Sequence, residues 1–74
     1  MATAAAPTYD RQRLREAIAY QGRLNQWIAE RTEYSESYVA KVLSGNLPLT
    51  EPFVIATAKA LDIPSHFFVS EVAA

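Results

Sequence analysis

Residues 24–45 of this 74-residue chain are LNQWIAERTEYSESYVAKVLSG, and this stretch decides how the chain folds. Its apolar residues have the spacing of two short helices that meet at a tight corner. The side chains expected inside the corner are Ile28, Ala29, Val39, Val42 and Leu43. The polar side chains left facing outward are Gln26, Ser35, Glu36, Ser37, Tyr38, Lys41 and Ser44. The apolar residues therefore set the angle of the corner, and the polar residues offer hydrogen-bonding groups to a partner.

The ends of these two helices carry residues that favour helix termini. We expect the first helix over about residues 25–32, with Asn25 as its N-cap. The second should begin at Ser35, whose hydroxyl can accept a hydrogen bond from an amide two or three residues further on, and should end at Gly45. This arrangement is typical of a helix-turn-helix motif, whose second helix enters the major groove of DNA.

A further helix is expected before the corner, over about residues 10–21, with Thr8 or Asp10 as its N-cap. Its inner stripe follows the spacing i, i+3, i+4, i+7 and consists of Leu14, Ala17, Ile18 and Gln21. Gly22 suits the position that closes this helix. The first nine residues are small, rich in alanine and contain Pro7, so we expect residues 1–9 to form a flexible arm.

Two more helices are expected after the corner. Thr50 should cap the fourth helix, because Glu51 and Pro52 both suit a first helical turn. The inner face expected for this helix is Val54, Ile55, Ala58 and Leu61. A short fifth helix should follow over residues 65–70. The expected fold class is therefore all-α, with five helices.

Composition narrows the classes of function. The chain has no cysteine, which excludes a disulfide framework and a thiolate zinc site and favours a cytoplasmic setting. No apolar run approaches the roughly 18 residues that span a bilayer, so no membrane association is expected. His66 has no companions at metal-ligand spacing, and no nucleophile–base set or glycine-rich phosphate loop is present. We therefore expect no enzyme activity, no cofactor and no metal.

The charge balance does not favour strong DNA binding by a single copy. The net charge is −1, with seven Lys and Arg in total, whereas affinity for phosphates comes from such cations. The early part of the chain is the more basic, because it holds Arg11, Arg13, Arg15 and Arg23. Binding to DNA is therefore expected to need a dimer or a partner protein.

Three segments carry a resemblance to a known family: LREAIAYQG, IAERTEYSESYVAKVLSG and FVIATAKALDIPSHFFV. Together they resemble the Cro/C1-repressor-type (Xre-like) helix-turn-helix family over about residues 14–68. The resemblance implies a compact, lambda-repressor-like domain over residues 10–72, with the helix-turn-helix formed by helices 2 and 3. It further implies a transcriptional regulator of a phage or bacterium, acting in the nucleoid or in the infected cell. The implied partner is a near-palindromic operator in double-stranded DNA.

The same resemblance implies roles for single residues. The base-contacting positions of the family correspond to Glu36, Ser37 and Lys41. Glu36 can accept a hydrogen bond from cytosine, Ser37 can donate or accept one, and Lys41 can donate one to guanine. Ser35 and Tyr38 share the start of that helix and are expected to face bases or phosphates. The candidates for phosphate contacts are Gln26, Ser44 and Asn46. The phosphate-contacting glutamine of the family corresponds to Asn25 by position or to Gln26 by residue type.

Three positions depart from the family pattern. Arg23, followed by Leu24, stands where the family usually has a buried leucine that opens the second helix, which indicates a one-residue slip at this junction. Glu33 stands where the family usually has glycine in the turn, which carries a cost if that position needs a positive φ. Trp27 stands at a usually polar, exposed place, and either folds over the core or anchors another protein. The acidic residues and Trp27 also fit an alternative function, a protein-interaction module such as an antitoxin, anti-repressor or docking domain. The surplus of apolar residues near the end predicts a homodimer contact through Phe67, Phe68 and Val72.

Overall fold

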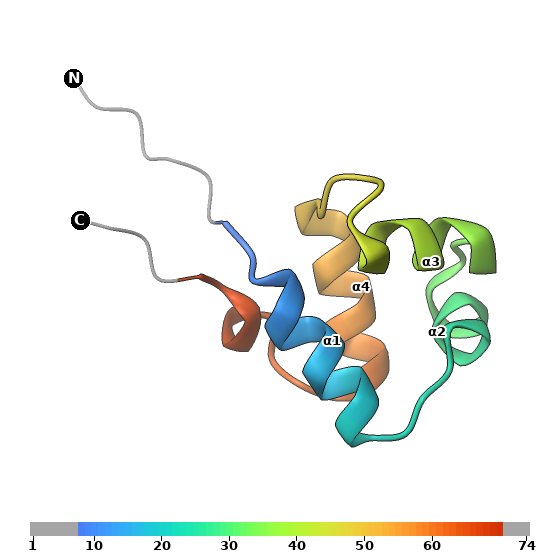
Figure 1. Ribbon diagram of the computed structural model, residues 1–74. Coiled ribbons are helices and arrows are strands. Elements are labelled where there is room, and N and C mark those ends of the chain that lie inside the picture. The colour runs from blue at the N-terminus through green and yellow to red at the C-terminus, as the bar shows by residue number, and fades with distance from the viewer. Residues whose placement is uncertain (1–7, 71–74) are drawn as a thin grey trace.

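A computed structural model describes residues 8–70, and its helices lie where the apolar stripes of the sequence predict them (Figure 1). The elements are α1 (Arg11–Tyr20), α2 (Asn25–Thr32), α3 (Glu36–Ser44), α4 (Glu51–Leu61) and a 3₁₀ helix, η1 (Ser65–Phe68). The all-α class is confirmed for the described residues. The fifth helix expected over residues 65–70 is a single 3₁₀ turn of 4 residues. None of the helices in residues 8–70 has both the length and the apolar character needed to cross a lipid bilayer.

Three of the four expected N-cap positions are confirmed: Asp10 for α1, Ser35 for α3 and Thr50 for α4, although the Thr50 side chain makes no capping hydrogen bond. The side chain of Asp10 accepts a hydrogen bond from the amide of Arg13 at 3.1 Å, and Ser35 Oγ accepts one from the amide of Tyr38 at 3.0 Å. The expectation of Asn25 as an N-cap is wrong by one residue. Leu24 holds that position and offers no side-chain hydrogen bond, because its side chain is apolar. Leu24 is also 71% exposed.

The core lies between all four α-helices and η1. Its buried apolar members are Leu14, Ile18, Ile28, Val39, Val42, Leu43, Phe53, Val54, Ala58, Leu61 and Phe68. One expectation for α4 is wrong: Ile55 is 46% exposed, whereas Phe53 and Thr57 are fully buried. Phe53 and Thr57 are four residues apart, so they lie on one side of α4, and the larger apolar area of the phenyl ring turns that side inward.

The two ends of the described chain pair with each other. Tyr9 and Val69 form an isolated antiparallel bridge, and the amide of Asp10 donates to the carbonyl of Phe68 at 2.8 Å. The expected arm therefore ends earlier than residue 9, while residues 1–7 lie outside the described part. The Tyr9 hydroxyl donates to a Glu51 carboxylate oxygen at 3.3 Å. Burial, helped by this negative charge, raises the pKa of the Tyr9 phenol above its ordinary value.

Arg11 joins the start of α1 to the end of α3. Its Nε donates to the carbonyl of Val42 at 2.9 Å, and its Nη2 donates to the carbonyl of Leu47 at 3.2 Å. Carbonyls at the C-terminal end of a helix lack partners within the helix and carry partial negative charge. The partly buried guanidinium of Arg11 therefore connects α1 to α3. The sequence pattern alone does not distinguish such an arginine from one that is exposed to solvent.

Candidate nucleic-acid interface

The corner formed by α2 and α3, residues 25–44, lies on the side of the domain away from η1 (Figure 1). The two helices pack against each other, and α2 also packs against α4. The buried residues of the pair are Ile28 from α2 and Val39, Val42 and Leu43 from α3. Ala29 is half-buried against this core. The apolar residues expected inside the corner therefore hold the two helices together.

The chain turns between these helices at Glu33, which has φ 69° and ψ 6°. This is the left-handed region, where a residue with a Cβ is held at a cost of about 1–2 kcal/mol. The amide of Glu33 donates to the carbonyl of Ala29 at 3.2 Å, which closes the end of α2. The position where the family usually has glycine therefore does have a positive φ in this chain, and a glutamate adopts it.

We predict that Glu33→Gly raises the free energy of unfolding by about 1 kcal/mol, because glycine adopts a positive φ without the steric cost. Urea unfolding followed by circular dichroism measures this change. The matched control is Glu33→Ala, which keeps the strain but removes a negative charge from the C-terminal end of α2, where such a charge is unfavourable. An equal gain in both variants would show that charge, and not backbone strain, is responsible.

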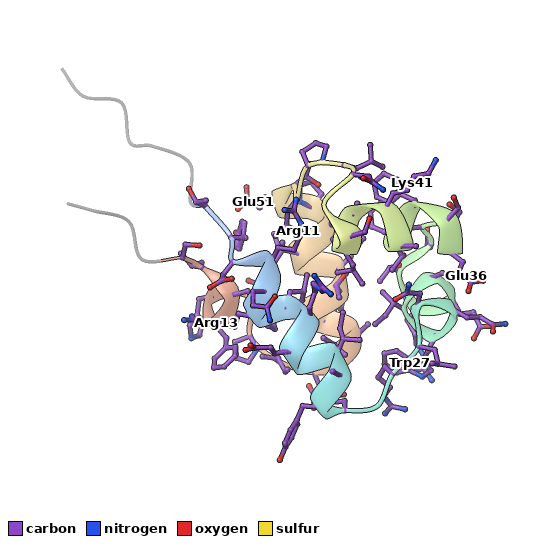
Figure 2. All side chains as sticks on the ribbon, in the orientation of Figure 1. Arg11, Arg13, Trp27, Glu36, Lys41 and Glu51 are labelled. Carbon is purple, nitrogen blue, oxygen red and sulfur yellow. The ribbon has the colours of Figure 1, made fainter. Side chains whose placement is uncertain are left out.

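The outward side of α3 carries three exposed polar side chains for which the family resemblance implies base contacts: Glu36, Ser37 and Lys41. Figure 2 shows Glu36 and Lys41 at the outer edge of α3. None of the three makes a side-chain hydrogen bond to any of residues 8–70 in the structure. Their donors and acceptors are therefore available to a partner that lies against α3.

Ser35 and Tyr38 stand at the start of α3 but serve the fold. Ser35 Oγ caps the helix. The Tyr38 ring stacks on the Tyr34 ring with centroids 4.9 Å apart, and both rings contact Phe53. The half-buried Tyr38 ring is therefore a packing group, and not the fully outward side chain expected from the sequence. Tyr34 was missed, because a turn residue gives no periodic signal for burial.

The residues expected to contact phosphates are divided between two ends of the corner. Gln26 is exposed in the first turn of α2, and its Nε2 donates to Glu30 Oε2 at 3.5 Å. Ser44 is exposed at the end of α3, and its hydroxyl donates to the carbonyl of Lys41 at 3.1 Å. Asn46 is exposed in the loop after α3. Because no side chain caps α2, the amides of its first turn remain to bind an anion or water.

Of the two positions expected for Trp27, the structure shows the one against the core. Its indole is half-buried against the core, and the Arg23 and Arg31 guanidinium carbons lie 4.3 and 4.8 Å from its ring centroids. The negative face of the indole attracts both guanidinium groups by cation–π interaction. The ring is therefore partly covered by arginines of its own chain.

The structure leaves only part of the expected dimer contact exposed to solvent. Phe68 is fully buried in the core and is unavailable to a second copy, so that expectation is wrong for Phe68. Phe67 is 51% exposed, and the Arg13 guanidinium carbon lies 5.7 Å from its ring centroid, while Arg13 Nη1 donates to its carbonyl at 3.0 Å. Val72 lies outside the described residues. The two phenylalanines differ because the 3₁₀ turn directs successive side chains to different sides.

Comparison with protein-family models, with curated proteins and with solved structures finds no significant match to this chain. Within residues 8–70, no three His, Asp or Glu side chains are grouped closely enough to hold a metal ion.

Proposed function

We propose that this protein is a sequence-specific, DNA-binding transcriptional regulator that uses α2 and α3 as a helix-turn-helix, in a five-helix, lambda-repressor-like domain of the Cro/C1 type. The observation that carries the proposal is the two-sided character of α3. One side is buried against α2 and the core, and the other presents Glu36, Ser37 and Lys41 to solvent. The major groove of B-DNA, about 12 Å wide, admits an α-helix with such a face.

In this proposal α3 enters the groove, and its outer side chains contact the edges of bases. Lys41 donates to guanine, Ser37 donates or accepts, and Glu36 accepts from the amino group of cytosine. Gln26, Ser44 and Asn46 contact phosphates on either side and fix the register. Occupancy of an operator then excludes polymerase, and regulation follows from that competition.

A second copy supplies the affinity that one copy lacks. The chain carries a net charge of −1, so a single domain neutralises few phosphates. Two copies on a near-palindromic operator place their α3 helices about 34 Å apart, in successive major grooves. The exposed Phe67 ring is a contact available to such a dimer.

Selection of bound duplexes from a random pool tests the proposal, because the recovered sequence gives both the operator and the half-site spacing. We expect Lys41→Ala and Ser37→Ala to lower affinity for that operator, with Lys41→Ala costing about tenfold. Both side chains are exposed, so circular dichroism should be unchanged. Lys59→Ala removes a similar charge from α4 and should leave affinity nearly unaltered. Operator binding that neither α3 variant weakens would remove α3 as the recognition helix.

A protein-interaction module, such as an antitoxin, anti-repressor or docking domain, is the second candidate. The exposed carboxylates of Glu33 and Glu36 beside the outward face of α3 favour it, because acids repel phosphate. Trp27 no longer favours it, since arginines cover part of the indole. Retention on immobilised random duplex at low salt separates the two: a DNA-binding protein is held and elutes as salt rises, whereas a protein-binding module flows through.

A further inference from the structure

A depression of about 310 Å³ lies where α1, the start of α2 and the end of α3 meet. Arg15 from α1 and Arg23 from the connection before α2 both line it, and both are exposed. Among its lining residues, all within residues 8–70, there is no acidic side chain. Two cations share a concave site without a carboxylate to neutralise them, so the site favours an anion.

The fold holds one of these arginines in position. The guanidinium carbon of Arg23 lies 4.3 Å from the centroid of a ring of Trp27, and Trp27 itself packs against the core. Figure 2 shows the Trp27 side chain on α2, near the connection from α1. A guanidinium stacked on an aromatic ring keeps its N–H groups in a plane, and these bind phosphate oxygens in a bidentate manner. Stacking also reduces the side-chain entropy that Arg23 loses when it binds.

The depression adjoins the outward side of α3. Ala40 and Ser44 of α3 form part of its lining, and Lys41 lies between them in the chain. A helix seated in the major groove has a sugar–phosphate strand along each side. In the proposed complex, the strand on the α1 side of α3 passes this depression, and its negative charge complements the two arginines.

We propose that Arg15 and Arg23 form a binding site for a backbone phosphate of duplex DNA, and that Trp27 is a positioning residue that holds Arg23 for this contact. The site rests on the proposed function and adds to it a sequence-independent contact outside the recognition helix. Ser44 also lines the site, but its hydroxyl already donates to the carbonyl of Lys41, so Arg15 and Arg23 supply the donors to the phosphate.

The test uses a random-sequence duplex of about 20 base pairs and fluorescence anisotropy at several salt concentrations. Each phosphate contact contributes about 0.9 to the slope of log affinity against log salt. We expect Arg23→Gln and Arg15→Gln each to lower the magnitude of that slope by about 0.9. The matched control is Lys59→Gln, which removes a charge on α4 that lines a different depression, and it should leave the slope unchanged.

Trp27 is tested by a double-mutant cycle, because a purely structural role would give a different pattern. Trp27→Leu should lower duplex affinity about two- to fivefold without changing the slope, since no charge is lost. The same change in the Arg23→Gln background should have no effect. Trp27→Phe keeps an aromatic face, so its affinity for the duplex should lie between the affinities of the wild type and of Trp27→Leu. An equal loss in both backgrounds would overturn the positioning role.

The outcomes also separate this site from the proposed function. If the wild-type chain binds the duplex but Arg15→Gln and Arg23→Gln keep its salt slope, the phosphate site is overturned and α3 remains the candidate interface. If the wild-type chain does not bind duplex even at low salt, the regulator proposal fails and the site fails with it. Circular dichroism of each variant excludes unfolding as the cause of a loss.

Discussion

Replacing Phe68 with alanine is expected to lower the free energy of unfolding by about 3–5 kcal/mol. The phenyl ring is fully buried, and it is among the largest buried side chains of the domain. Truncation removes the transfer free energy of the ring and leaves a cavity that the surrounding helices fill only in part. A domain of 74 residues has a total stability of roughly 4–11 kcal/mol, so this single change is expected to remove much of it.

The neighbouring residue provides the matched control. Phe67→Ala makes the same chemical change one position earlier, where the ring is half exposed, and should cost less than about 1 kcal/mol. Urea unfolding of both variants, followed by tryptophan fluorescence and circular dichroism, measures the difference. Similar losses from the two substitutions would mean that η1 does not direct Phe68 into the core and Phe67 out of it.

Replacing Arg11 with methionine is expected to cost about 2 kcal/mol, the second-largest effect. Methionine retains most of the length of the side chain but cannot donate to the carbonyls of Val42 and Leu47, which Arg11 contacts at 2.9 and 3.2 Å. A cation is also lost from the C-terminal end of α3, where the helix dipole favours positive charge. The estimate is lower than two full charged hydrogen bonds because Arg11 is only partly buried.

Arg15→Met is the control for this prediction, because Arg15 lies one turn further along α1 and is exposed. It makes no side-chain hydrogen bond to the rest of residues 8–70. Its substitution should change stability by less than about 0.5 kcal/mol. Thermal unfolding at neutral pH measures both variants. If Arg11→Met is as stable as Arg15→Met, the contacts of Arg11 with α3 and the following loop contribute nothing net.

Much of the candidate interface follows from local rules. Ser35 caps α3 because a hydroxyl at that position satisfies a free amide, and Gly45 ends it at φ 97°. The same periodicity that buries Val39 places Lys41 and Ser37 on the opposite side of one short helix. These features depend on residues within a few positions of each other, and for that reason the outward face of α3 could be predicted.

Other features of the fold could not be predicted from the sequence, because they depend on contacts between residues that are far apart in the chain. Tyr38 was expected to face outward, yet its ring stacks on Tyr34 and contacts Phe53, which lies fifteen positions later in the chain. Ile55 was expected inside α4, yet Phe53 and Thr57 occupy the inner side. Periodicity gives the relative positions of side chains around a helix but not the rotation of that helix against its neighbours. Where a helix is apolar on several sides, packing decides which side is buried.

The sequence by itself determined the helices, most of their caps and the polar side of α3, because each depends on local backbone geometry and on hydrogen bonds between near neighbours. The tertiary structure alone decided that Phe68 is buried and Phe67 is exposed, that Arg11 joins α1 to α3, and that Arg15 and Arg23 share one depression. These outcomes depend on how the helices pack against one another, and the spacing of residues along the chain does not contain that information.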